Sequence, residues 1–239
     1  MITRAEIGKL IVLHAVEPTV LSLYLRVPRD PAEVRALPAR SLQLMAAAAT
    51  GPGGAGLLRE EDRAAVRAGV AAHGGDWPGR TAAIFACADA GLFATYPLAC
   101  DLPERAVLGT RPHVRPLLAS LQRYPADVAD RHAQRLAAEI LRAAPAGLAA
   151  IGLAECLAAV NAHAVDLLVV PDDGLVPGFA CGRCGALATA PDGCPDWGTA
   201  PQPVPDLIEE MVARTLEDDG EILAVRDAPF QVAARLRFR

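Results

Sequence analysis

The sequence has few aromatic residues and no long uninterrupted apolar segment. Phenylalanine, tryptophan and tyrosine make up 4% of the 239 residues, whereas apolar residues make up 52% and charged residues 21%. The hydrophobic cores must therefore be built mainly from alanine, leucine and valine. The nearest candidate for a membrane helix, residues 147–160, is interrupted by Glu155 and is shorter than the roughly 18 residues required. The composition predicts a folded, soluble protein without a membrane partner.

The sequence also lacks a secretory signal and an excess of basic charge. Residues 1–14 carry charges among their apolar positions and contain no small-residue cleavage site, so we expect a cytoplasmic protein. The net charge is −5 and the pI is about 5.5, which disfavours a general phosphate-binding surface and argues against DNA as a partner. Cys87, Cys100 and Cys156 stand alone in apolar surroundings and are expected to be reduced core residues.

The length of the chain favours two modest domains, which we place at residues 1–124 and 125–239. Strand and helix patterns mix in the first half, which predicts an α/β fold class. The expected strands are 20–27, 81–87, 91–98 and 105–108, with a hairpin through Asp89 and Ala90, and the expected helices are 31–48, 58–72 and 114–124.

The second half alternates helices and strands, which predicts a small three-layer α/β domain. Helices are expected over 127–143, 152–161 and 205–218, and strands over 165–170 and 221–226. Residues 171–203 are rich in proline, glycine, aspartate and cysteine, and they contain an insertion at about 178–200 that resembles a zinc knuckle.

The insertion carries three cysteines at a spacing typical of zinc ribbons. Cys181 and Cys184 form a first knuckle, and Cys194 supplies half of a second one, in which Trp197 stands where a fourth cysteine is expected. Structural zinc takes four cysteine or histidine ligands in a tetrahedron, and paired ligands on one knuckle direct both sulfurs to one point. The three cysteines therefore predict a degenerate zinc site.

Several alternatives remain open for this segment. An oxygen of Asp192 or Asp196, or a water molecule, could complete the zinc shell, although none of them gives the affinity of a fourth thiolate. Alternatively, the segment is a metal-free relic held by packing, with a Cys181–Cys184 disulfide under oxidation. A redox role for the pair is less favoured, because it requires a helix N-terminus and the following residues read as a loop.

The sequence contains one basic stretch and no constellation of catalytic residues. The five histidines are scattered, and none has a spacing that suggests a base beside a nucleophile, so we expect no enzymatic activity. The basic stretch is the candidate for contact with rRNA or tRNA. Its residues are Arg111, Arg115, Arg123, Arg131 and Arg135.

Taken in order, five segments of the second half form a recognisable pattern: AIGLAECLAAVNAHAVDLLVV (150–170), CGRCG (181–185), CPDWG (194–198), DLIEEMVARTLEDDGEILAVRD (206–227) and VAARLRF (232–238). This pattern resembles the C-terminal domain of the archaeal and eukaryotic class-1 peptide chain release factor family, in a divergent bacterial branch that also includes Balon-type ribosome hibernation factors. The first half resembles the N-terminal domain of the same branch through residues 17–30, 82–98 and 111–125.

The resemblance implies a C-terminal domain similar in fold to archaeal kink-turn-binding ribosomal proteins, and a role in binding the ribosome or a translation factor. Family members place a central domain between the two halves matched here, and that domain carries the Gly-Gly-Gln loop that assists hydrolysis of peptidyl-tRNA. The present sequence contains neither Gly-Gly-Gln nor the Asn-Ile-Lys-Ser stop-codon element. The loop at 152–155, which contacts RNA in the kink-turn binders, lacks their asparagine here.

These features predict a non-enzymatic, release-factor-like protein that lacks the central domain and binds the ribosome or a translation factor in stress or hibernation. A protein-interaction scaffold that has left translation altogether is the main alternative. A small-molecule or redox enzyme that uses the sheet edge or Cys181 and Cys184 is the third.

Overall fold

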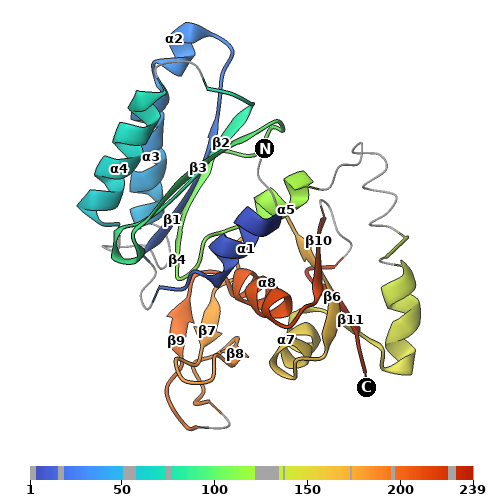
Figure 1. Ribbon diagram of the computed structural model, residues 1–239. Helices are drawn as coiled ribbons and strands as arrows, with labels where there is room; N and C mark the ends of the chain where they lie inside the picture. Colours follow the sequence, from blue (N-terminus) through green and yellow to red (C-terminus); the bar gives the residue numbers. More distant parts are fainter. Residues whose placement is uncertain are drawn as a thin grey trace. The chain divides into compact units, whose positions relative to one another are not determined.

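The structure, a computed structural model, describes residues 4–15, 19–50, 58–73, 77–121, 135–136, 138–172, 174–194, 197–225 and 230–238. It divides into two compact units, residues 1–113 and 114–239 (Figure 1). The sequence prediction placed the domain boundary at 124. The helix that it assigned to the end of the first domain, α5 (Arg115–Leu121), belongs to the second unit.

Unit 1 is built on a four-stranded antiparallel sheet. The strands are β1 (Val20–Arg26), β2 (Thr81–Cys87), β3 (Leu92–Leu98) and β4 (Arg105–Gly109), and their order in the sheet is β3-β2-β1-β4. The predicted hairpin is confirmed: β2 and β3 are joined by the short 3-10 helix η1 (Ala88–Ala90) and by Gly91, whose φ of +61° suits a residue without a side chain.

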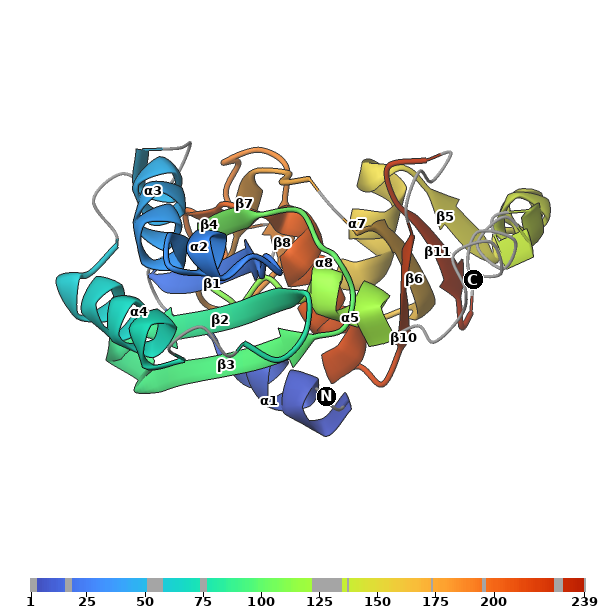
Figure 2. The ribbon, with the colours of Figure 1, turned by 90° about the horizontal axis from the view of Figure 1, so that it is seen from above.

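Helices α3 (Leu37–Thr50) and α4 (Glu60–Ala72) cover one face of this sheet (Figures 1 and 2). The predicted helix 31–48 is divided into α2 (Pro31–Val34) and α3, because Pro38 has no N–H to donate to the carbonyl of Val34. A shorter helix, α1 (Arg4–Val12), precedes β1. The shared core is made of Leu21, Leu23, Leu25, Val34, Leu37, Met45, Val66, Val70, Trp77, Ala82, Ile84, Ala86 and Leu108.

The central sheet of unit 2 has the order β10-β6-β11-β5. Its strands are β5 (Ala149–Ile151), β6 (Val165–Pro171), β10 (Glu221–Val225) and β11 (Ala233–Leu236). β10 runs parallel to β6, whereas β11 is antiparallel to both of its neighbours. The sequence prediction missed β5 and β11.

Helices cover both faces of this sheet, which gives the expected three layers (Figure 2). Helices α7 (Leu153–Asn161) and α8 (Leu207–Glu217) pack on the face to which β6 contributes Leu168 and Val170. Residues 138–143 are helical and pack on the opposite face through Ile140, against Leu167 and Val169. The apolar run of β6 is explained, because both of its faces are buried.

A separate small sheet with the order β8-β7-β9 carries the cysteine-containing segment of unit 2. Its strands are β7 (Gly178–Ala180), β8 (Leu187–Ala188) and β9 (Gln202–Val204), and all of its pairings are antiparallel. Mixed helices and sheets in both units confirm the α/β fold class. Among the described helices, none is both long and apolar enough to cross a membrane.

Candidate metal centre

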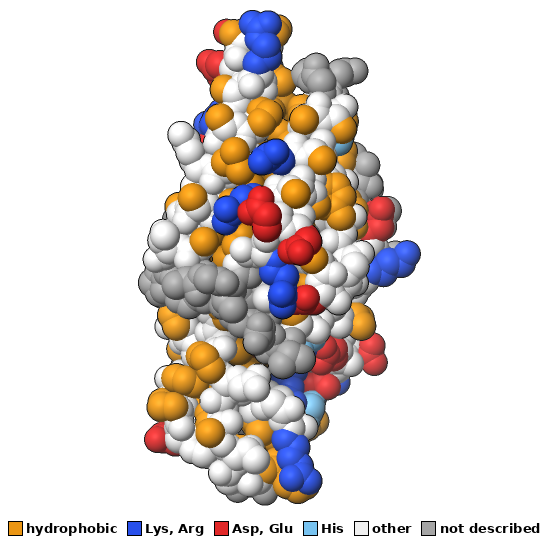
Figure 3. Space-filling model, turned by 90° about the vertical axis from the view of Figure 1, so that its left-hand side faces the viewer, with side chains coloured by type: hydrophobic (Ala, Val, Ile, Leu, Met, Phe, Trp, Pro, Cys, Tyr) orange, Lys and Arg blue, Asp and Glu red, His pale blue; other side chains and the backbone are white. Residues whose placement is uncertain are grey.

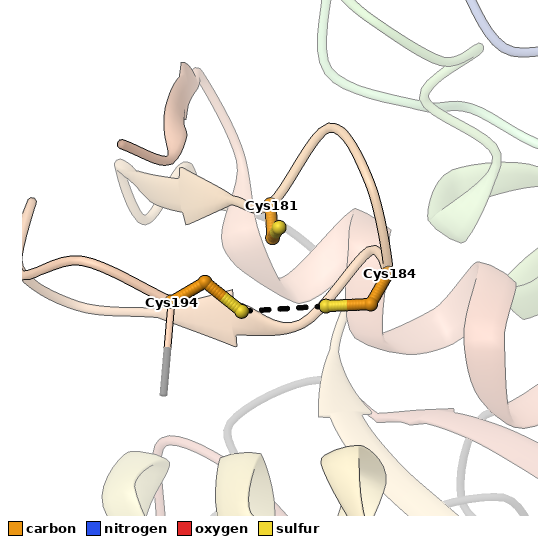
Figure 4. A group of neighbouring side chains, drawn as sticks. All are labelled: Cys181, Cys184 and Cys194. Carbon is orange, nitrogen blue, oxygen red and sulfur yellow. Dashed lines mark hydrogen bonds between the residues drawn. The ribbon is translucent and has the colours of Figure 1, made fainter. Parts of the chain in front are cut away.

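The structure brings Cys181, Cys184 and Cys194 together at one end of the small sheet (Figure 4). Their three sulfur atoms all lie within 4.8 Å of one another, and the Sγ atoms of Cys184 and Cys194 are 3.4 Å apart. Cys181 and Cys194 are 2% and 5% exposed, and Cys184 is half-buried. The three residues that the spacing singled out therefore form one cluster.

The first knuckle is a tight turn closed by two backbone hydrogen bonds. The N–H of Gly185 donates to the carbonyl of Cys181 at 2.7 Å, and the N–H of Cys181 donates to the carbonyl of Ala186 at 2.8 Å. Gly185 has a φ of +70°, a conformation that costs a residue with a side chain about 1–2 kcal/mol. The turn therefore depends on glycine at this position.

The second knuckle repeats this pattern. The N–H of Gly198 donates to the carbonyl of Cys194 at 2.7 Å, the N–H of Cys194 donates to the carbonyl of Thr199 at 2.9 Å, and Gly198 has a φ of +62°. The two knuckles thus share their closing hydrogen bonds and their glycine conformation, although the second has Trp197 in place of a cysteine.

Trp197 supplies no ligand, because the indole N–H is only a donor. Its side chain is 50% exposed, and the guanidinium carbon of Arg183 lies 3.7 Å from the centre of its ring. This cation–π contact joins the tips of the two knuckles. The side chain at the position where a fourth cysteine was expected therefore makes a stacking contact.

Of the two aspartates that could complete a zinc shell, Asp192 does not join the cluster in the described part of the chain. There, the sulfurs of the three cysteines have no carboxylate or imidazole close enough to join them, and Asp192 is exposed. Asp196 lies outside the described residues. The neighbour that does reach the cluster is Thr199, whose Oγ1 lies 3.3 Å from Sγ of Cys181.

The remaining predictions for the cysteines concern a disulfide and the burial of the three cysteines outside the cluster. No disulfide joins any of the six cysteines in this structure, and the sulfur of Cys184 lies 3.4 Å from that of Cys194; the Cys181–Cys184 disulfide under oxidation stays a prediction. Cys87 and Cys156 are buried as predicted, and burial raises the pKa of Cys156 to about 12, whereas Cys100 is only half-buried.

Hydrogen bonds separate the acidities of the first two cysteines. The hydroxyl of Thr199, followed by the backbone N–H groups of Cys184 and Arg183, lowers the pKa of Cys181 to about 6. The N–H of Ala186 favours the thiolate of Cys184, but burial and the adjacent sulfurs together hold the pKa of Cys184 above its ordinary value. These hydrogen bonds favour the thiolate form of Cys181.

Two side chains from the helices of unit 2 hold the first knuckle in place. Arg214 of α8 donates from Nη1 to the carbonyl of Gly185 and from Nη2 to that of Cys184, each at 2.8 Å. Asn161 of α7 exchanges two hydrogen bonds of 2.9 Å with the backbone of Leu187. The sequence prediction missed both residues, because nothing in the local sequence marks a side chain that reaches a distant backbone.

The cluster fits a thiophilic metal ion. Sulfur ligands of a tetrahedral zinc ion lie about 3.8 Å apart, given Zn–S bonds of about 2.3 Å. The three sulfurs, which all lie within 4.8 Å of one another, are close to the spacing that this arrangement needs. Cys181, Cys184 and Cys194 would hold the ion, and it would supply a cross-link between the two knuckles.

The arginines predicted to contact RNA do not form one site in the described residues. Arg115 is fully buried, and its guanidinium donates to Asp206, Glu209 and the carbonyls of Pro171 and Gly174. This geometry does not fit an RNA contact, because the donors are engaged inside unit 2.

The remaining arginines of that stretch lie in different parts of the chain. Arg111 donates to the carbonyl of Ile11 at 2.8 Å in unit 1, and Arg135 is exposed in unit 2. Arg123 and Arg131 lie outside the described residues. On the face drawn in Figure 3, the coloured basic side chains lie among acidic and apolar ones and do not form a continuous basic patch.

No protein-family model matches the chain, and no curated protein matches its sequence. Among solved structures, the chain is similar to the C-terminal domain of the peptide chain release factor from Methanosarcina mazei, with 20% identity over 47% of this chain and 85% of that chain and a TM-score of 0.34. It is also similar to a structure described as an archaeal protein, with 12% identity, coverage of 98% and 96%, and a TM-score of 0.31. Both TM-scores are too low to establish a shared fold.

Proposed function

We propose that this chain is a non-enzymatic, release-factor-like protein that binds the ribosome or a translation factor under stress or in hibernation. The observation that carries the proposal is the paired knuckle of unit 2, in which Cys181–Gly185 and Cys194–Gly198 repeat one hydrogen-bond pattern. These are the segments CGRCG and CPDWG through which the sequence resembles release factors. The three-layer α/β core that carries them agrees with the same resemblance.

A binding role needs no reacting group, and the sequence supports this interpretation. It contains no Gly-Gly-Gln tripeptide, so the hydrolytic loop of release factors has no counterpart here. Three charged side chains that are buried in unit 2 are engaged with one another, because Arg115 forms ion pairs with both Asp206 and Glu209. We therefore assign them to the stability of the fold and not to catalysis.

The metal in this proposal is zinc, and its role is structural. Cys181, Cys184 and Cys194 supply three thiolates, and water or Asp196 completes the shell. A zinc ion held in this way stabilises the two knuckles as a single surface element.

Sedimentation of ribosomes tests the proposal. Extracts of growing and starved cells that express the tagged full-length chain are separated on sucrose gradients, and the chain is expected with ribosomal particles, at least in the starved extract. Cys184→Ser should reduce this fraction, whereas Cys100→Ser, a half-buried cysteine outside the cluster, should not. A chain that stays wholly in the soluble fraction in both extracts would count against the proposal.

A second candidate function is a protein-interaction scaffold outside translation. It is favoured by the exposed Trp197 under Arg183, because tryptophan and arginine are enriched at the centres of protein interfaces. A stable complex with one protein and no rRNA in the same gradients would support this alternative.

A further inference from the structure

Unit 1 contains a cavity of about 370 Å³ at the end of the sheet where β1 ends and β2 begins. Its volume falls in the range of about 300–1,000 Å³ that small-ligand sites occupy. Three arginines line it, Arg26, Arg29 and Arg80, together with one carboxylate, Asp101, and the indole of Trp77. The lining thus has a surplus of two positive charges in a chain whose net charge is −5.

Among the described residues, no carboxylate neutralises the charges of two of the three arginines. Arg80 pairs with Asp101 at 2.5 Å, so that the acidic group of the cavity is already engaged. Glu104 accepts a hydrogen bond from the backbone N–H of Arg26, but the carboxylate of Glu104 forms its ion pair with Arg40. Within the described ranges, the guanidinium groups of Arg26 and Arg29 form no ion pair with a carboxylate.

The backbone fixes the rim of this cavity. The N–H of Arg80 donates to the carbonyl of Leu98 at 2.7 Å, and the N–H of Val27 donates to the carbonyl of Arg80 at 2.8 Å. Gly79 has a φ of +95°, and a Cβ at this position would lie 2.5 Å from the carbonyl oxygen of Leu98. The close approach of residue 79 to the end of β3 at Leu98 therefore requires glycine at this position.

The remaining walls are also ordered by specific contacts. Asp30, which follows Arg29, caps α2 by accepting a hydrogen bond of 2.8 Å from the N–H of Ala32. Trp77 is 8% exposed and stacks on His73, with ring centres 3.9 Å apart. The unpaired arginines thus project from a preformed frame, which lowers the entropic cost of binding.

We propose that this cavity binds a phosphate group, carried either by a small phosphorylated molecule or by an RNA backbone. The two unpaired guanidinium groups of Arg26 and Arg29 match the charge of one phosphomonoester dianion or of two successive monoanionic phosphates of an RNA backbone, and the planar arginine fork donates two parallel hydrogen bonds to phosphate oxygens. Arg80 keeps Asp101 from repelling the anion. This inference goes beyond the proposed function, since it holds whether or not the chain binds ribosomes.

Trp77 lines the cavity, so its fluorescence can report the binding of a ligand there. Trp77 and Trp197 are the two tryptophans of the chain, so the Trp197→Phe variant leaves a single indole at the cavity. Emission of Trp77 is followed while this variant is titrated with inorganic pyrophosphate and, separately, with a short oligouridylate RNA. Calorimetry with the unmodified chain provides a second measurement that does not depend on fluorescence.

Binding of either probe is expected, and Arg26→Gln and Arg29→Gln should each weaken it at least about tenfold, because each removes a charged hydrogen-bonding partner. Arg35→Gln is the matched control: Arg35 is exposed next to α2 but does not line the cavity, and binding should change less than about twofold. Circular dichroism establishes that each variant is folded.

The two probes separate the sources of the phosphate. If RNA carries it, the oligonucleotide binds more tightly than pyrophosphate, pyrophosphate competes with it, and its affinity falls steeply with salt. If a small molecule carries it, pyrophosphate binds and the oligonucleotide does not displace it. Absence of binding by both probes, or binding that Arg26→Gln and Arg29→Gln leave unchanged, would overturn the proposal.

Discussion

Gly198 occupies the same position in the second knuckle that Gly185 occupies in the first. Each donates its N–H to the carbonyl of the cysteine four residues earlier, at 2.7 Å, and each has a positive φ, +62° and +70°. The second knuckle therefore keeps the closing hydrogen bond and the glycine conformation of the first, although Trp197 stands where a fourth cysteine was expected. The turn, and not the ligand, is the feature that both halves of the cluster share.

This equivalence predicts that Gly185→Ala and Gly198→Ala each lower the free energy of unfolding by about 1–2 kcal/mol, because alanine is strained at positive φ. Gly185→Ala should have the larger effect, since its Cβ would lie 3.3 Å from Nη2 of Arg214, whereas a Cβ on Gly198 meets nothing within 4 Å. Chemical denaturation measures both. Gly182→Ala, a control with only ordinary contacts in the same knuckle, should stay within about 0.5 kcal/mol of the wild type.

Arg214 is expected to control the affinity of the cluster for metal without being a ligand. Arg214→Ala removes the two hydrogen bonds to the carbonyls of Cys184 and Gly185, and loss of such outer contacts typically weakens metal binding by about 10–100-fold. Competition with a chromophoric chelator measures the change. Arg183→Ala removes only the stacking contact with Trp197, so equal losses in both variants would contradict this role for Arg214.

The buried ion pairs of Arg115 should contribute strongly to the stability of unit 2. Arg115→Ala would remove the buried guanidinium that pairs with both Asp206 and Glu209, and breaking a buried pair by removing one partner costs about 3–5 kcal/mol. Arg235 and Asp166 form an exposed pair in the same unit, with side chains 44% and 43% exposed. Arg235→Ala should therefore cost at most about 1 kcal/mol in the same denaturation experiment. Similar losses for both variants would show that Arg115 is not the buried centre described here.

Asp62 should make the stability of unit 1 depend on pH. Its side chain is 2% exposed, Oδ1 accepts a hydrogen bond of 2.7 Å from the N–H of Ala88, and Oδ2 has no partner within the described structure. Burial raises the pKa of Asp62 above its ordinary value of 3.8. Because the folded chain holds the proton more tightly than the unfolded chain, this group contributes stability at low pH that is lost as the pH rises through the folded pKa.

The neutral variant Asp62→Asn isolates this contribution. The stability of Asp62→Asn relative to the wild type should increase as the pH is raised from about 3.8 upward, since only the wild type acquires a buried charge. Thermal or urea unfolding of both proteins over this interval measures the difference. A difference that is constant with pH would contradict a raised pKa for Asp62.

Much of the fold follows from local sequence patterns. Strand β2 has the predicted bounds, Thr81–Cys87, and the apolar run of β6 marked a strand buried on both faces. In contrast, β11 was missed. Ala233–Leu236 is short, and it becomes a strand by inserting between β6 and β5, a long-range pairing that residue periodicity does not encode.

The candidate site was predictable in its ligands but not in its supports. Cysteine spacing identified Cys181, Cys184 and Cys194, because ligands on one knuckle must be close in sequence. The glycine that follows each knuckle, at 185 and 198, was the available sign of the repeated turn. Arg214 lies 29 residues from Gly185, and only the packing of α8 brings the two together.

Metal content is the most direct test of the central claim, that three cysteines on two equivalent knuckles hold a structural metal ion. The full-length chain is purified without added zinc and analysed by inductively coupled plasma mass spectrometry beside Cys194→Ala and the control Cys100→Ser. We predict close to one zinc ion per chain in the wild type and in Cys100→Ser, and far less in Cys194→Ala. A fully folded wild-type chain that contains no metal, and that takes up none when zinc is supplied, would contradict the claim.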